Sequence, residues 1–160
     1  MEYKRGDILA CKNNSYLSKF IRFLTKSKFS HLAIIVNKNE IIEADGIIGH
    51  ICYRNISEYK NYADIYTCDN LTDEQRNNIC KYAISKVGQK YDYYLLFVLF
   101  VKQVFGVKIR IRDGEKDICS ELVNDAYFNG AGVILSKKRF PIPDDVIFNE
   151  NNILRYVGSI

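Results

Sequence analysis

The sequence predicts one α+β domain, in which an antiparallel sheet or small barrel packs against helices. Short apolar runs with strand character alternate irregularly with segments whose apolar residues recur at helical spacing. The chain has 160 residues, a length that fits a single domain spanning residues 1–160. Its composition, 48% hydrophobic and 26% charged, is that of an ordinary globular protein. We find no internal repeat, low-complexity segment or linker.

The first half of the chain predicts a strand, a helix and a β-hairpin. Residues 8–11 form a short apolar run, and residues 16–24 carry apolar side chains at helical spacing. Two strand-like runs, residues 31–36 and 40–44, flank Asn37-Lys38-Asn39, whose residue types favour a turn. The two runs are therefore predicted to pair as a hairpin.

The second half predicts two more strands, three helical segments and a final turn and strand. Thr72-Asp73-Glu74-Gln75 is a capping-box pattern, so a helix is expected from there to Gly88. A second helix is expected at Cys119, with Asp117 as its N-cap. The other expected segments are strands at 47–53 and 63–68, an apolar helix at 91–105, a basic connection at 106–114, a turn at 141–145 and an edge strand at 153–157.

Charge and hydropathy exclude several classes of partner. The net charge is only +4 and the basic residues are spread along the chain, so we do not expect nucleic-acid binding. The longest apolar run, residues 93–101, is about half the length that a membrane span requires. Contact with a membrane surface has no specific support, and the sequence says nothing about oligomeric state. The polar start of the chain does not resemble a secretory signal, so we expect a cytoplasmic location.

The cysteines predict free thiols rather than a metal site. There are five of them, an odd number, without the paired spacing of zinc ligands. The two histidines, His31 and His50, are far apart in sequence. Reduced cysteines in a cytoplasmic protein are the simplest interpretation.

Cys119 is the candidate nucleophile. It is expected within the first turn of its helix, where free backbone N–H groups and the helix dipole favour the thiolate. The thiolate, unlike the thiol, is a strong nucleophile. From this segment alone, a small buried structural cysteine is an equally good interpretation.

His31 is the candidate base, because it begins an apolar strand. Glu43 is expected on the neighbouring strand, where a buried carboxylate needs a partner. A three-residue loop at residues 37–39 places Glu43 opposite Ala33 and diagonal to His31, on the same face. A two-residue turn would instead place Glu43 on the other face, and Asp45 or a backbone carbonyl would then orient the histidine.

Several short segments of the sequence resemble a known superfamily. Residues 30–36 and 42–44 are similar to the histidine strand and third-residue strand of NlpC-type papain-like cysteine peptidases, and residues 117–123 to the start of the nucleophile helix. Because His and Glu precede Cys, the order resembles the circularly permuted branch, which includes the YiiX-like proteins and the lecithin:retinol acyltransferase group. Shorter similarities to this branch occur at residues 6–8, 88–92 and 143–145.

The resemblance implies a permuted papain-like fold and specific roles for several residues. Cys119 would be the nucleophile, His31 the general base and acid, and Glu43 the residue that orients the imidazole. A glutamate at the third position is typical of the YiiX-like group, whereas the acyltransferases usually carry a histidine there. Tyr91, Ser30 and Ser120 would be candidate substrate-binding residues, although Tyr91 is equally well interpreted as a packing aromatic.

The expected activity is hydrolysis of amide or ester bonds through an acyl-enzyme, with no metal or organic cofactor. Small peptides, amino-acid amides and acyl amides are the expected substrates. Two alternatives stay open from the sequence. One is a thiol acyltransferase acting on lipid-like acyl groups, and the other is a catalytically silent ligand-binding module with the same fold.

Overall fold

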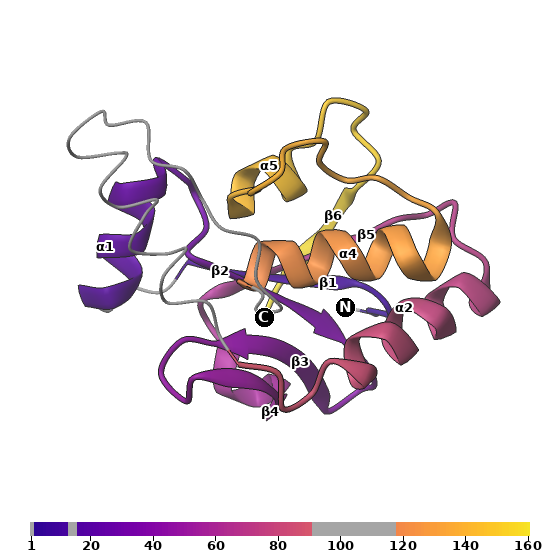
Figure 1. Cartoon of the computed structure of the whole chain (residues 1–160), viewed down its shortest axis with the longest axis horizontal. Helices are drawn as coiled ribbons and strands as arrows, with labels where there is room; N and C mark the ends of the chain where they lie inside the picture. The colour runs from indigo at the N-terminus through magenta and orange to yellow at the C-terminus, as the bar shows by residue number, and fades with distance from the viewer. Residues whose placement is uncertain (1, 13–15, 91–117) are drawn as a thin grey trace.

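Six antiparallel strands form one sheet in the computed structural model, which describes residues 2–12, 16–90 and 118–160 (Figure 1). The strands are β1 (Ile8–Cys11), β2 (His31–Ile35), β3 (Glu40–Asp45), β4 (His50–Asn55), β5 (Ala63–Thr67) and β6 (Arg155–Ser159). Their order across the sheet is β4-β3-β2-β1-β5-β6. The N-terminal strand therefore lies inside the sheet, next to the strand that begins with His31.

The helices pack mainly on one face of this sheet. They are α1 (Tyr16–Thr25), the short 3₁₀ helix η1 (Ile56–Tyr59), α2 (Asp73–Ser85), α4 (Cys119–Ala131) and α5 (Pro143–Ile147). Figure 1 shows α2 and α4 side by side, with α4 beginning near the start of β2. The tertiary structure therefore brings the first residue of α4, Cys119, close to the strand that His31 begins.

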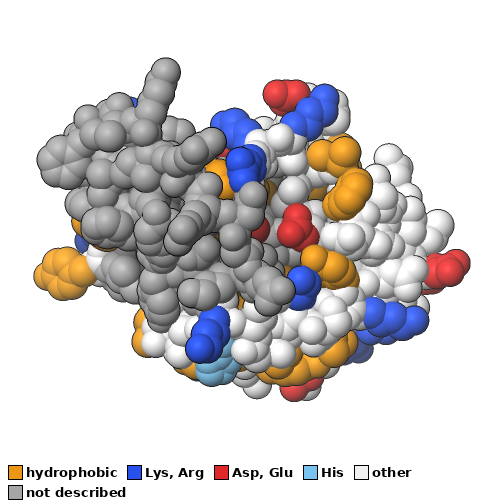
Figure 2. Space-filling model, in the orientation of Figure 1, with side chains coloured by type: hydrophobic (Ala, Val, Ile, Leu, Met, Phe, Trp, Pro, Cys, Tyr) orange, Lys and Arg blue, Asp and Glu red, His pale blue; other side chains and the backbone are white. Residues whose placement is uncertain are grey.

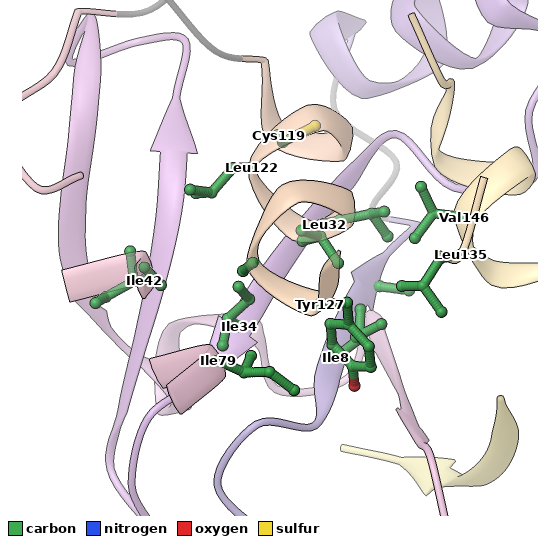
Figure 3. Packing of buried hydrophobic residues seen from close by; sticks show 14 of the residues in the cluster. Ile8, Leu32, Ile34, Ile42, Ile79, Cys119, Leu122, Tyr127, Leu135 and Val146 are labelled. Carbon is green, nitrogen blue, oxygen red and sulfur yellow. The ribbon is translucent and has the colours of Figure 1, made fainter. Parts of the chain in front are cut away.

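Strand side chains alternate between two apolar clusters. In β1, Ile8 and Ala10 belong to the larger cluster, and Leu9 belongs to the smaller one on the other face. The larger cluster fills the space between the sheet, α2 and α4, where Leu122 and Tyr127 are fully buried (Figure 3). The larger cluster also receives side chains from α5, so that α5 is packed against the same core as α4.

The close packing of α2 and α4 depends on one residue without a side chain. A Cβ atom added at Gly130 would lie 2.4 Å from the backbone nitrogen of Ile79, far inside van der Waals contact. The glycine thus allows the backbone of α4 to approach α2 directly. This contact fixes the position of the helix that carries Cys119.

The register of the predicted hairpin is confirmed. Ala33 pairs with Glu43 and Ile35 pairs with Ile41, which leaves residues 37–39 as the loop. Glu43 is therefore on the same face of the sheet as His31, in the diagonal position. The three-residue loop places Glu43 on this face, because side chains alternate along a strand and a two-residue turn would have placed Glu43 on the other face.

Three predicted element boundaries are wrong. β4 begins at His50 rather than at residue 47, because Asp45 accepts hydrogen bonds from the amides of Ile47 (2.6 Å) and Ile48 (3.0 Å) and holds them in a turn. The N-cap of α4 is Ile118, which has no capping oxygen; its amide instead donates to Glu121 Oε2 at 3.1 Å. The last strand is an extended edge strand as predicted, but it begins at Arg155.

Several predictions lie outside the described residues. These are the apolar helix at 91–105, the basic connection at 106–114 and the contribution of Asp117. Among the described helices, none has both the length and the apolar character needed to cross a bilayer. On the described part of the face drawn in Figure 2, basic and acidic side chains are interspersed, consistent with the small net charge.

Candidate active site

Cys119 is the first residue of α4, as Figure 3 shows. It lies at the end of the helix where backbone N–H groups have no intrahelical acceptor. The residue is 7% exposed and therefore almost fully buried. The positive end of the helix dipole lies at this position, which favours negative charge on a bound oxyanion.

His31 connects Cys119 to a carboxylate. Its Nε2 atom lies 2.6 Å from Glu43 Oε2, and Cys119 is near enough to the ring to raise the pKa of His31. Because Nε2 is engaged by Glu43, Nδ1 is the ring nitrogen left for the sulfur. The His31 side chain is 23% exposed, so one part of the ring remains accessible from outside. The predicted set of Cys119, His31 and Glu43 is thus brought together in space.

Glu43 is held from its other side by two residues that the sequence interpretation missed. Tyr59, from η1, donates a hydrogen bond to Glu43 Oε1 at 2.6 Å. Arg54 Nε lies 3.6 Å from the same oxygen. Glu43 itself is only 2% exposed, so these contacts supply the polar partners that a buried carboxylate requires.

Asp45 does not orient the histidine. Its carboxylate accepts from the amides of the β3–β4 turn and from Arg54 NH2 at 2.7 Å. Asp45 therefore shapes the turn and holds the guanidinium that lies near Glu43. The alternative that the hairpin places Asp45 against His31 is not what the structure shows, since Glu43 occupies that position.

The electrostatics of the three groups are coupled. Burial lowers the pKa of His31, but the negative charges of Glu43 and Cys119 and hydrogen bonds to both raise it well above its ordinary value. Burial raises the pKa of Glu43, yet the charge of His31 and hydrogen bonds from His31 and Tyr59 outweigh this and lower it. Both shifts favour an imidazolium paired with a carboxylate.

A titration of His31 tests this coupling. We expect Glu43→Gln to lower the pKa of His31, because the substitution removes the negative charge that raises it. The imidazolium of the variant then loses its proton at a lower pH than in the wild type. The measurement is an NMR titration of the ring resonances, which is simple in a chain with two histidines, and His50 serves as the internal reference.

Asp45→Asn is the matched control for that titration. It removes a neighbouring carboxylate whose bonds go to the turn amides and Arg54, so we expect a smaller change at His31. An unchanged His31 pKa in Glu43→Gln would contradict the pairing. A larger change in Asp45→Asn would return the orienting role to Asp45.

The three predicted substrate-binding residues do not share one environment. Ser30 is 6% exposed; its hydroxyl accepts from Ser18 Oγ at 2.6 Å and donates to the carbonyl of Cys11 at 3.2 Å. Ser120 is fully buried, and its hydroxyl donates to the Pro141 carbonyl at 2.5 Å. Both hydroxyls are engaged within the fold, so we assign them to positioning rather than to substrate. Tyr91 lies outside the described residues.

The remaining cysteines are free thiols. Cys11 pairs with His31 across β1 and β2, and burial, with the charges of Glu43 and Cys119, raises its pKa well above the ordinary value. Cys52 is half-buried opposite Glu43, and burial also raises its pKa. Within the described residues, no group of three or more His, Cys, Asp or Glu side chains is arranged to hold a metal ion.

The sequence does contain a local signal for Tyr59. Asn55 and Glu58 form a capping box, with Asn55 accepting from Ser57 N and Glu58 accepting from the Asn55 amide at 3.2 Å. This pattern predicts the short helix that carries Tyr59. That its hydroxyl meets Glu43 depends on the path of the chain from β4, which local patterns do not specify.

A thiol at the start of a helix, near an imidazole that extends from an antiparallel sheet, is the arrangement of papain-like cysteine hydrolases. Residues 2–151 match the sequence profile of the C92 family, described as permuted papain-like amidase enzymes of the YaeF/YiiX type. The chain belongs to this family, and it is therefore an enzyme of the cysteine peptidase/amidase class.

One solved structure extends the comparison to the fold. The chain is similar to the crystal structure of metalloprotein yiiX from Escherichia coli O157:H7, with a TM-score of 0.61 and 20% sequence identity. The match covers 98% of this chain and 88% of that one. No curated protein matches the chain in sequence. The expected α+β, permuted papain-like fold is thus confirmed.

Proposed function

We propose that the protein hydrolyses amide or ester bonds through an acyl-enzyme on Cys119, with His31 as general base and acid and Glu43 as the orienting residue. The observation that carries this proposal is the 2.6 Å contact of His31 Nε2 with Glu43 Oε2, made by a ring that Cys119 lies near enough to perturb. The family match over residues 2–151 supports cysteine hydrolase chemistry and one domain over residues 1–160.

The chemistry follows from the positions of these groups. The Cys119 proton passes to His31, and the thiolate attacks the carbonyl carbon of the substrate. Backbone amides at the start of α4, where N–H groups have no intrahelical acceptor, stabilise the oxyanion of the tetrahedral intermediate. His31 then gives its proton to the leaving amine or alcohol, and the thioester remains on Cys119.

Deacylation uses the same groups in reverse. His31 takes a proton from water, the resulting hydroxide attacks the thioester, and Cys119 leaves as the thiolate. The product is a carboxylic acid. Glu43 stays ionised throughout; it holds the ring so that Nδ1 faces the sulfur and stabilises the imidazolium that forms in each half-reaction.

The enclosed sulfur favours a slender acyl group. Cys119 is 7% exposed and the neighbouring ring 23%, so we propose small peptides, amino-acid amides or acyl amides rather than folded proteins as substrates. No step calls for a metal or organic cofactor. The five free cysteines support a reducing compartment such as the cytoplasm.

Trapping the acyl-enzyme tests the proposed function. We expect p-nitrophenyl esters of short acyl groups to give a rapid release of p-nitrophenol and a mass increase on the Cys119 peptide in rapidly quenched samples. Added amines or amino alcohols should divert little of the acyl group from water. Transfer to the added amine in preference to water would instead identify an acyltransferase.

The same experiment tests whether the protein is instead a catalytically silent ligand-binding module. Absence of an adduct on Cys119, together with alkylation by iodoacetamide no faster than at Cys52, would contradict the enzymatic proposal. Cys52 is the suitable internal comparison because it is the cysteine that is half-buried, whereas the other three, Cys11, Cys68 and Cys80, are buried like Cys119.

A further inference from the structure

The segment from Pro141 to Asp144 contacts both elements that carry the proposed catalytic groups. At one end, Asp144 accepts hydrogen bonds from the loop immediately before β2. Its carboxylate receives Ser27 Oγ at 2.5 Å, the Lys28 amide at 2.7 Å and the Phe29 amide at 3.2 Å. Two residues beyond this loop the strand begins with His31.

At the other end, the segment is bonded to the nucleophile helix. Ser120, which follows Cys119 directly, donates its hydroxyl proton to the Pro141 carbonyl at 2.5 Å. Ser120 is 0% exposed, so water does not compete for this bond. The two contacts lie three residues apart in one short stretch of chain.

The segment is itself anchored in the protein core. Pro143 occupies the start of α5, where its fixed φ suits the first turn of a helix. Val146 and Ile147 then enter the larger apolar cluster, and Figure 3 shows Val146 beside Leu135, close to Leu32 of β2. A stretch held in this way resists displacement of either end.

We propose that residues 141–144 form a bridge that sets the separation of Cys119 and His31, with Asp144 and Ser120 as positioning residues. This inference rests on the proposed function. The two reacting groups come from elements that are remote in sequence, and α4 and β2 meet mainly through apolar packing, which is not directional. The hydrogen bond from the buried Ser120 hydroxyl and the three hydrogen bonds accepted by the Asp144 carboxylate are directional, so they fix the relative position of the two elements.

The expected effect is on reactivity more than on folding. A misplacement of about 1 Å between reacting groups is able to lower a rate by about 10²-fold. We therefore expect Asp144→Ala to slow alkylation of Cys119 by iodoacetamide at neutral pH by at least about tenfold. The pH dependence of alkylation should also differ from that of the wild type, because the sulfur no longer transfers its proton efficiently to His31.

Asp145→Ala is the matched control. Asp145 is on the same short helix, but its bonds are with Lys138 Nζ (2.7 Å) and the Ile142 amide (3.1 Å), within its own part of the chain. Its loss should lower the thermal midpoint as much as the loss of Asp144 but leave the alkylation pH profile as in the wild type. Rates are measured on the Cys119 peptide by mass spectrometry, well below the thermal midpoint of each variant.

A double variant tests whether the two ends act as one unit. If the bridge works as proposed, Ser120→Ala alone slows Cys119, and Ser120→Ala with Asp144→Ala is little slower than either single variant. Where the Asp144→Ala protein does not fold, Asp144→Asn keeps one acceptor oxygen and should show a smaller change in the same direction.

Two results would overturn the bridge. One is a wild-type pH profile in Asp144→Ala, and the other is the same shift in Asp144→Ala and Asp145→Ala, which would show only general support of α5. A His31→Gln sample measured in parallel separates this from failure of the proposed function. If alkylation of Cys119 does not depend on His31 at all, the catalytic proposal fails; if it does, but Asp144 has no effect, only the bridge fails.

Discussion

Replacing Cys119 with alanine is expected to lower kcat/KM on a p-nitrophenyl ester by on the order of 10⁴- to 10⁶-fold, to background. The substitution removes the atom that forms the covalent bond to the acyl group, and no neighbouring group replaces it. The helix should remain intact, because alanine is a good helix former and the residue lies at the helix start. Steady-state kinetics and circular dichroism of the purified variant provide the measurement.

Cys52→Ala is the control for this variant. Cys52 is a free cysteine on β4, close to Glu43 in the sheet register, and it has no place in the proposed reaction. We expect it to retain wild-type activity. Turnover that survives in Cys119→Ala, or disappears in Cys52→Ala, would show that the nucleophile has been assigned to the wrong residue.

Replacing His31 is expected to have the second largest effect, a loss of about 10⁴-fold in kcat/KM. His31→Ala removes the group that accepts the Cys119 proton and returns it to the leaving group. It also leaves the buried Glu43 carboxylate without one of its two nearest partners, which destabilises the fold. His31→Gln separates these effects, because its amide still donates to Glu43 while it is unable to act as a base.

The chain provides a matched control for this variant as well. His50 begins β4, forms a bridge to Lys90 and has no place in the proposed reaction, so His50→Gln should keep its activity. Glu43→Gln should lose less activity than His31→Gln, because it retains part of the orienting hydrogen bond. A fully active His31→Gln protein would contradict the proposed role of the imidazole.

Much of the site was predictable because its signals are local. The three-residue loop at Asn37-Lys38-Asn39 was enough to place Glu43 opposite Ala33, since strand side chains alternate with a period of two. The boundary of β4 was missed for an equally local reason, since Asp45 binds two amides that would otherwise continue the strand. Local residue spacing thus accounts both for the correct hairpin register and for the wrong start of β4.

The supporting contacts were not predictable in the same way. Tyr59 meets Glu43 across 16 residues, and Asp144 meets Ser27 across 117. No spacing rule relates such residues, because their separation depends on how the helices pack on the sheet. The packing of α5 and η1, which sequence patterns do not specify, decided which hydrogen-bond partners Asp144 and Glu43 have.

The sequence by itself determined which chemical groups are available and which local elements carry them: a thiol at a helix start, an imidazole at a strand start and a carboxylate on the adjacent strand. Only the tertiary structure decided that these groups meet, and that Tyr59 and Asp144 hold them in place. The physical reason is range. Backbone periodicity acts over a few residues, whereas the meeting of sulfur and imidazole depends on packing and hydrogen bonds between elements that are remote in sequence.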